Sequence, residues 1–358
     1  MASRIYLDHA ASTPVLPQAV RAMAEGLSCW ANPSSPHREG RAARRALEDA
    51  RAAVAGAYGW RGSTLFTSGA SEALAVALTR SVADRIVVTT VEHDAVLRVA
   101  GRARTVGVDR AGQVDAAALG AVLAGPGRAL VAVQWANSET GVRQPIAAIA
   151  ELVHAAGHLL LVDAAQMPAG IDPHVSEHAD FVALSAHKRG GPPGMGALLV
   201  RDLGMLTPTG GQEFGYRAGT ENLPAALGYA AALAEPEPVD RWAALRDRLD
   251  DGVRRSGGEV VGEGSPRHPA IGGYRMPGVA SAAQLIRFDL AGIAVSAGSA
   301  CSSGSMKPSH VLGAMDWSEV AGREVVRISF GRDTTEAEVD VAIAAWRDIA
   351  RAVRRIAA

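Results

Sequence analysis

The stretch Phe181-Val182-Ala183-Leu184-Ser185-Ala186-His187-Lys188 decides the fold of this chain. Its first four residues are apolar, which predicts a short buried strand, and a lysine follows shortly after the strand. Only two of the 36 basic residues are lysines. Arginine replaces lysine on a solvated surface, but only a lysine amine can lose its proton and attack an aldehyde. A chain with this bias is expected to keep lysine where amine chemistry is needed.

The overall composition limits the class of protein. A length of 358 residues is ample for two domains, and the formal net charge is −1. Such a balance argues against direct binding to nucleic acid or to a membrane surface through bulk charge. The N-terminal residues lack the apolar core of a signal peptide, and no apolar run approaches the roughly 18 residues of a membrane span. We therefore expect a cytoplasmic protein.

Short β-branched runs alternate with alanine-rich helical stretches through the first two thirds of the chain. This alternation predicts an α/β fold, with a mostly parallel sheet and helices on both faces. The predicted strands are residues 64–67, 85–89, 129–133, 158–162, 181–184 and 197–200.

The alternation of β-branched and alanine-rich stretches ends near Glu235-Pro236-Glu237-Pro238. Beyond it come an amphipathic stretch, a short strand at 325–330 and a last helix from about Thr335. We predict a large domain at 14–238, and a smaller α+β domain made of 1–13 and 239–358.

Small and polar residues follow several of the predicted strands, where an open parallel sheet binds its ligand. Residues 67–72 form a glycine turn that opens a helix, His93 follows the next strand, and Asp163 and Lys188 follow two later ones. Each of the first three also fits an ordinary structural role, such as a helix cap or a structural hydrogen bond. Together, a phosphate cradle, a histidine, a carboxylate and a lysine suit pyridoxal 5′-phosphate bound as a lysine Schiff base.

At these residues the chain resembles the cysteine desulfurases of the NifS/IscS type, which have the class V aminotransferase fold. The resemblance covers nearly the whole chain and implies a pyridoxal-phosphate-dependent transferase of fold type I. The segments that carry it are residues 6–14, 32–35, 67–72, 92–93, 136–141, 163–166, 185–188, 217–222, 296–301 and 326–331.

The resemblance implies a role for each residue around the cofactor ring. Lys188 would bind the cofactor aldehyde and then move protons on the substrate carbons. Asp163 would pair with the ring nitrogen and keep it protonated. His93 would stack on the ring and help with proton transfer, and Gln166 would bind the ring hydroxyl.

The resemblance also implies how the cofactor phosphate is held. Ala70 and Ser71 at a helix start, Ser185 and His187 would bind it, together with Thr220 reaching across from a second subunit. The last role implies a homodimer with shared active sites. No metal ion is implied at this site.

The resemblance further implies that Arg327 binds the substrate carboxylate, a role that its planar guanidinium suits because it can donate two hydrogen bonds. The family commonly has two consecutive asparagines in the turn after the central strand, and the second contacts the ring hydroxyl and the substrate carboxylate. Here the pair is Asn137-Ser138. The shorter Ser138 would lose one contact, supply it through water, or leave it to Asn137.

The two cysteines, Cys29 and Cys301, are expected to differ in role, and no disulfide framework is expected. Cys301 lies among four serines, one alanine and one glycine in residues 299–305, which suits a mobile nucleophile that takes sulfur from the substrate. Cys29, next to Trp30, is predicted to be structural in an apolar setting.

These expectations combine into a homodimeric cysteine desulfurase. It would convert L-cysteine to L-alanine, and a persulfide on Cys301 would pass to an acceptor protein for iron–sulfur cluster assembly or thiolation. One alternative is another lyase or aminotransferase of the same fold, such as a selenocysteine lyase. A second alternative is a non-catalytic sulfur carrier that keeps the fold.

Overall fold

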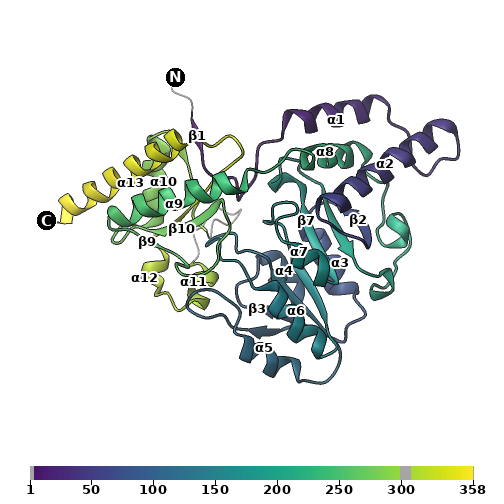
Figure 1. Cartoon of the computed structure of the whole chain (residues 1–358), viewed down its shortest axis with the longest axis horizontal. Helices are drawn as coiled ribbons and strands as arrows, with labels where there is room; N and C mark the ends of the chain where they lie inside the picture. Colours follow the sequence, from purple (N-terminus) through teal and green to yellow (C-terminus); the bar gives the residue numbers. More distant parts are fainter. Residues whose placement is uncertain (1–3, 299–307, 358) are drawn as a thin grey trace.

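A seven-stranded sheet forms the core of the larger of two lobes in the computed structural model, which describes residues 4–298 and 308–357 (Figure 1). The strand order is β2-β8-β7-β6-β5-β3-β4. Strand β8 runs antiparallel to both of its neighbours, and the remaining pairs are parallel, as predicted. The strands are β2 Ser63–Thr67, β3 Arg85–Thr89, β4 Arg104–Val106, β5 Ala129–Gln134, β6 Leu159–Asp163, β7 Phe181–Ser185 and β8 Gly196–Val200.

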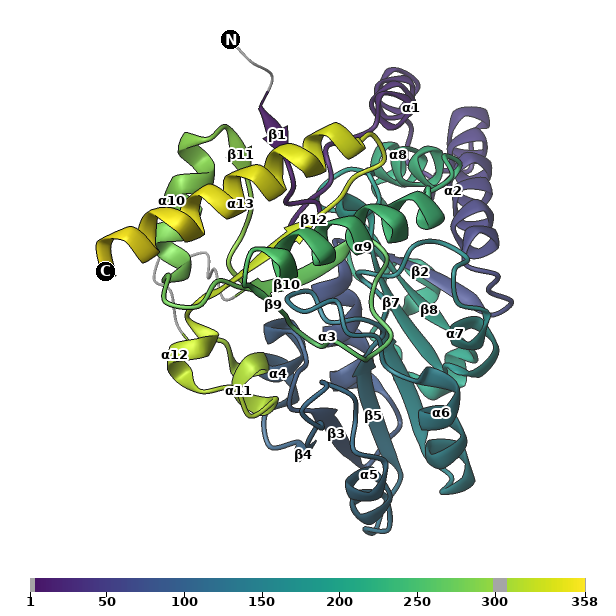
Figure 2. The same ribbon diagram turned by 60° about the vertical axis from the view of Figure 1, so that its left-hand side comes forward.

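Helices cover both faces of this sheet, which explains why its strands are apolar throughout (Figure 2). Along β6, Leu160 and Val162 belong to one apolar core, whereas Leu159 and Leu161 belong to the core on the opposite face. The first core includes residues of α2 Arg38–Ala57, α5 Ala116–Leu123, α6 Ile146–Ala155, α7 Pro173–His178 and α8 Leu223–Leu233. The second includes residues of α3 Ala70–Arg80 and α4 Asp94–Ala100.

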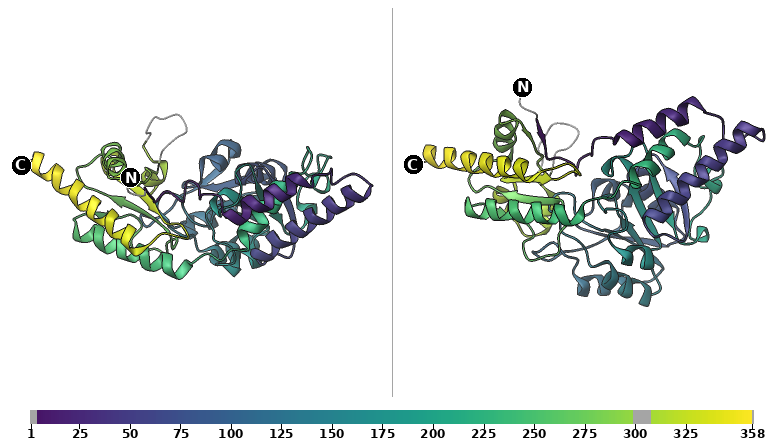
Figure 3. Two further views of the ribbon diagram at one scale, coloured as in Figure 1. Left: turned by 90° about the horizontal axis from the view of Figure 1, so that it is seen from above. Right: turned by 45° about the horizontal axis from the view of Figure 1, so that its top comes forward.

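A second, smaller group of elements builds its own apolar core beside the large sheet (Figure 3). Its antiparallel sheet has the order β12-β10-β9, and the N-terminal strand β1 pairs in parallel with β11. The exact domain bounds at 13/14 and 238/239 stay predictions. The elements are β1 Ile5–Tyr6, α9 Val239–Arg255, β9 Glu259–Val260, β10 Ile271–Arg275, α10 Ser281–Leu290, β11 Ile293–Ala294, α11 His310–Ala314, α12 Glu319–Gly322, β12 Val325–Ser329 and α13 Glu336–Ala357.

Three short 3-10 turns complete the described chain: η1 Ala186–Lys188, η2 Leu203–Met205 and η3 Glu213–Gly215. Among the described residues, none of the helices combines the length and the apolar character needed to cross a membrane.

Cys29 lies at the end of α1 Pro17–Ser28, and its predicted apolar setting is wrong. Both Cys29 and Trp30 are exposed. The helix packs against α8 through small residues such as Ala19 and Gly26, and it ends before Cys29 could reach that contact. The thiol instead donates a hydrogen bond of 3.1 Å to the carbonyl of Glu25 at the surface.

The smaller core depends on Trp346 of α13, which is fully buried. Its ring packs near Tyr274 and Phe288, with centroids 6.2 and 6.3 Å away. We predict that Trp346→Ala lowers the free energy of unfolding by about 3–5 kcal/mol, because it leaves a cavity that the neighbours cannot fill. The exposed Val341→Ala on the same helix is the control and should change it by under about 0.5 kcal/mol. Urea denaturation measures both, and equal effects would contradict the prediction.

Candidate active site

Neighbouring strands bring Lys188 and Asp163 to the same edge of the sheet. Asp163 is the last residue of β6, and Lys188 ends the turn η1 that follows β7. Burial, opposed by the charge of Asp163 and assisted by the charges of Arg327 and Arg189, lowers the pKa of the Lys188 amine to about 8. A considerable share of this amine is therefore unprotonated near pH 8, which is the form that attacks an aldehyde.

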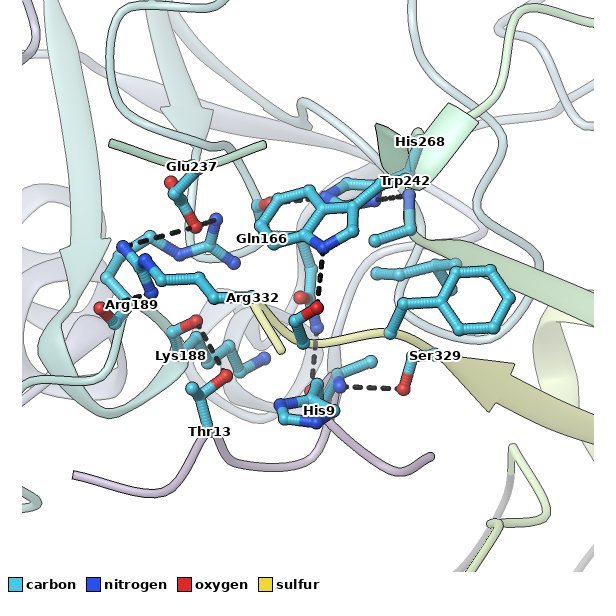
Figure 4. Close-up of a pocket in the computed structure, with 15 residues that line it drawn as sticks. His9, Thr13, Gln166, Lys188, Arg189, Glu237, Trp242, His268, Ser329 and Arg332 are labelled. Atoms are coloured by element: carbon cyan, nitrogen blue, oxygen red, sulfur yellow. Dashed lines mark hydrogen bonds and ion pairs between the residues drawn. The ribbon is translucent and has the colours of Figure 1, made fainter. Parts of the chain in front are cut away.

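Lys188 and Gln166 line a small cavity together with Ala10 and Thr13 of the N-terminal segment (Figure 4). Hydrogen bonds join that segment to both residues. Thr13 Oγ1 donates to the Lys188 carbonyl at 3.2 Å, and Gln166 Nε2 donates to the Ala10 carbonyl at 3.0 Å. Gln166 Oε1 is buried and has no hydrogen-bond partner among the described residues. An orphaned acceptor at this depth is costly, so it indicates a missing donor such as a ligand hydroxyl.

His93 caps the N-terminus of α4, and its Nδ1 accepts a hydrogen bond of 3.1 Å from the Ala95 amide. In the neutral ring the proton is then on Nε2. Although solvent reaches the ring, crowding around it and the nearby charge of Lys188 lower the pKa of His93, while Asp163 opposes the shift. A neutral imidazole with one free N–H can stack on a ring and exchange a proton.

Glu92 lies fully buried next to His93 in the chain, and it was not predicted as a site residue. Its Oε1 accepts hydrogen bonds from Thr89 Oγ1 at 2.6 Å and from the Gln134 amide at 3.0 Å. Burial, with a contribution from the charge of Asp163, raises the pKa of Glu92 to about 8. The Glu92 carboxyl group is therefore neutral at pH 7, so Asp163 has no second negative charge from Glu92 beside it.

The start of α3 offers an anion site. Its N-cap is Gly69, whose φ of 152° few other residues adopt, and no side chain caps this helix. Backbone amides at Ala70 and Ser71 are consequently free of an intrahelical partner, as in phosphate sites at helix N-termini. A Cβ on Gly196 of β8 would approach Gly69 Cα to 2.6 Å, so the turn can lie this close only against a glycine.

The other predicted phosphate ligands lie on β7, on η1 and before α8. Ser185 is the buried last residue of β7. His187 Nδ1 lies 3.2 Å from Ser12 Oγ, and burial next to Lys188 lowers the pKa of His187 to about 4. His187 is therefore neutral at pH 7 and can act as a hydrogen-bond donor to an anion. Thr220 is exposed two residues before Asn222, the N-cap of α8.

Arg327 is buried in β12, and two contacts fix its guanidinium. Its Nη1 donates to the Ser138 carbonyl at 3.0 Å, and its Nη2 pairs with Asp8 Oδ1 at 2.6 Å. The Nε atom is buried without a partner among the described residues. The guanidinium thus keeps free N–H donors while Asp8 holds it in place, which suits recognition of a small carboxylate.

Asn137 and Ser138, the pair predicted to bind substrate, have different surroundings. The Asn137 side chain is buried and engaged by protein partners. It donates to the carbonyl of the distant Val91 at 3.2 Å, and it accepts from the Glu139 and Thr140 amides of its own turn. These contacts leave it little capacity for a ligand. Ser138 presents its carbonyl to Arg327 and is partly exposed, so its hydroxyl is the better placed of the two.

Cys301 lies outside the described residues, so the structure does not place the predicted nucleophile. The roles of Asp8 and Glu92 were missed, although both lie within segments that carry the family resemblance. A charged residue within an otherwise apolar or motif-bearing segment was the available signal. What the sequence could not provide is the partner of each group, since Arg327 and Asp8 lie 319 positions apart.

These residues fit pyridoxal phosphate. An amine of lowered pKa, a carboxylate beside it, an unpartnered buried amide oxygen and an uncapped helix start match its aldehyde, ring nitrogen, hydroxyl and phosphate in turn.

Comparisons with known proteins identify the family. The family model described as aminotransferase class-V matches residues 5–341. A cysteine desulfurase of Bradyrhizobium diazoefficiens is 40% identical, over 98% of this chain and 95% of its own length. A cysteine desulfurase of Cereibacter sphaeroides is also 40% identical, over 94% of this chain and 93% of its own. The solved NifS-like protein of Rickettsia africae superposes with a TM-score of 0.86 at 28% identity, covering 97% of this chain and 99% of that one.

The chain therefore belongs to the class-V aminotransferase family, in which pyridoxal-phosphate enzymes of fold type I are found. Its resemblance to the cysteine desulfurases of the NifS/IscS type is confirmed.

Burial of Glu92 generates a pH dependence of stability. Its pKa is about 8 in the folded protein, against an ordinary value of 4.5, so the folded chain keeps a proton that the unfolded chain releases. Glu92 therefore reduces stability progressively as the pH rises from about 4.5 to about 8. Glu92→Gln mimics the neutral form, and it should gain stability over wild type across this window by up to about 1.4 kcal/mol per pH unit. Urea unfolding at several pH values tests this.

The exposed Glu25→Gln on α1 is the matched control, because it removes one carboxylate without removing a buried one. It should leave the pH profile of stability unchanged. A difference between Glu92→Gln and wild type that does not vary with pH would show that Glu92 is ionised in the folded protein.

Proposed function

We propose that this chain is a pyridoxal-phosphate-dependent cysteine desulfurase, which converts L-cysteine to L-alanine and leaves the sulfur on Cys301 as a persulfide. The observation that carries the proposal is the desolvated amine of Lys188, beside Asp163 and within range of the charge of Arg327. Lys188 would couple to an aldehyde, Asp163 would support a protonated ring nitrogen, and Arg327 would bind a carboxylate. Together they suit chemistry on an α-amino acid.

The cofactor, when bound, supplies an aldehyde that couples to an amine and a ring that withdraws electrons from the substrate carbon. The residues proposed to hold it are Lys188 Nζ at the aldehyde, Asp163 at the ring nitrogen, Gln166 at the ring hydroxyl and His93 on the ring face. Ala70, Ser71, Ser185 and His187 would bind the phosphate.

Arg327 is proposed to bind the substrate carboxylate through the donors that Asp8 and Ser138 leave free. Asp8 fixes the guanidinium plane before substrate arrives, which reduces the entropy lost on binding. The Ser138 hydroxyl would add one hydrogen bond, whereas the Asn137 amide is engaged by Val91 and by its own turn. Lys188, released from the cofactor by the substrate amine, would then move the substrate protons.

Sulfur transfer is proposed to use Cys301 as a thiolate. Its sulfur attacks the sulfur of L-cysteine, an S–S bond forms, and the bond between that sulfur and the β-carbon breaks. The electron pair of the broken bond stays on the carbon, which takes up a proton to give L-alanine. The products balance as one alanine and one persulfide for each cysteine, and no external oxidant is needed.

The same proposal extends to the oligomeric state, the sulfur acceptor and the cellular location. A homodimer in which Thr220 completes the phosphate site of the second subunit agrees with the exposure of this residue in one chain. The persulfide would pass to an acceptor protein for iron–sulfur cluster assembly or thiolation, in the cytoplasm.

Substitution of Cys301 tests the proposal. We expect Cys301→Ser to bind the cofactor and L-cysteine normally but to form alanine at least about 100-fold more slowly, because a hydroxyl cannot replace a thiolate in attack on sulfur. Alanine is measured by amino-acid analysis, and the bound cofactor by its yellow absorbance.

Cys29→Ser is the matched control, because Cys29 is a thiol that is exposed at the surface. This variant should keep full activity. In wild type treated with L-cysteine, mass spectrometry should find one extra sulfur on the peptide that contains Cys301. Unchanged alanine formation by Cys301→Ser, or the sulfur mainly on Cys29, would overturn the proposal in favour of another lyase or aminotransferase.

A further inference from the structure

Two histidines and a glutamate gather on the outer surface of α7, away from the candidate active site. His174, Glu177 and His178 lie at positions i, i+3 and i+4 of this helix, so they share one face of it. Helix α7 packs beside α6 on the face of the sheet that carries α2 and α8 (Figure 2). The side chains of His174 and Glu177 are more than half exposed, and that of His178 is 42% exposed.

The same carboxylate oxygen faces both imidazole rings. His174 Nδ1 lies 3.4 Å from Glu177 Oε2, and His178 Nε2 lies 3.8 Å from that oxygen. Both separations exceed an ordinary N–H···O hydrogen bond of about 2.7–3.2 Å. The two rings are nearly parallel, at 12°, with centroids 5.9 Å apart. One potential ligand atom from each residue lies within 4.8 Å of the others.

These separations match donors that surround one metal ion. Zinc binds imidazole nitrogen and carboxylate oxygen at about 2.0–2.2 Å, which puts two donors of a tetrahedral site about 3.4 Å apart. The His174–Glu177 separation already equals that value, and the His178–Glu177 separation exceeds it by about 0.4 Å. The side chains of all three residues therefore already converge on one point beside α7.

We propose that His174, Glu177 and His178 form a transition-metal site on α7, with water in the remaining coordination positions. Two imidazoles and one carboxylate suit Zn²⁺, Cu²⁺ or Ni²⁺, whereas Mg²⁺ and Ca²⁺ prefer oxygen ligands alone. The site is structural, because β7 separates α7 from Lys188 by five strand residues, roughly 16 Å. The ion would stabilise one turn of the six-residue helix α7, which ends shortly before β7 begins at Phe181.

Zinc titration of the holoenzyme tests the proposal. To exclude binding by thiols, all proteins carry Cys29→Ser and Cys301→Ser. Calorimetry should find one Zn²⁺ per chain at this site, and the ion should raise the melting temperature because it binds only the folded helix. His174→Ala with His178→Ala should abolish both effects, and Glu177→Gln should weaken binding by about tenfold or more.

The matched control is His37→Asn, which removes an exposed histidine that also lies near a carboxylate, at 3.2 Å from Glu39, but has no second imidazole beside it. Asparagine preserves the N-cap that His37 provides to α2. This variant should bind zinc as well as its parent does, and Mg²⁺ should not compete.

Bound Cu²⁺ gives a second readout, because its electron paramagnetic resonance spectrum should carry couplings from two imidazole nitrogens that the double histidine variant lacks. With the two cysteines restored, the double histidine variant should keep wild-type desulfurase activity. Equal zinc binding by the parent and the double variant, or no binding by the parent, would overturn the proposal. Undiminished binding by Glu177→Gln would remove Glu177 from the site.

Discussion

The desolvation of the Lys188 amine is the constraint on which the candidate site depends. A lysine in water keeps its proton at neutral pH and cannot attack a carbonyl. Here burial lowers the pKa to about 8, and the guanidinium groups of Arg327 and Arg189 act in the same direction. The opposing charge of Asp163 is too weak to restore the ordinary value. The result is an amine that is reactive at physiological pH.

The sheet produces this arrangement because its strands end together. Strands β6 and β7 are neighbours and run in parallel, so the residues after them share one edge. A second negative charge near Asp163 is avoided because Glu92 remains protonated, and a second positive charge near Lys188 is partly balanced because Arg327 pairs with Asp8. Each buried charge of the site is therefore matched by a neighbour or removed by protonation.

Much of the fold could be predicted from sequence because burial on both faces makes a strand apolar along its whole length. Strand β4 was missed because it is an edge strand, and Arg104 and Thr105 within it are exposed. The reversed direction of β8 could not be predicted, since an apolar run has the same appearance in either direction. Cys29 was wrongly placed because its apolar neighbours do not reveal which face of α1 packs.

The candidate site was predictable where its residues follow strands directly, as Asp163 and Lys188 do. It was not predictable where the chemistry depends on long-range pairs. The contact of Arg327 with Asp8 and the hydrogen bond from Asn137 to the Val91 carbonyl depend on how distant segments pack. The helix-spaced triad on α7 was visible in the sequence, but its meaning depends on the rotamers that turn both rings toward Glu177.

Competitive labelling of Lys188 tests the central claim most directly. The cofactor-free protein would be treated with a trace of acetic anhydride at pH values from about 6 to 11, with Nα-acetyl-lysine amide in the same tube as a reference amine. Mass spectrometry of the Lys188 peptide then gives the pH at which the amine becomes reactive. We predict a midpoint near 8 for Lys188. A midpoint equal to that of the reference amine, near 10.4, would contradict the account.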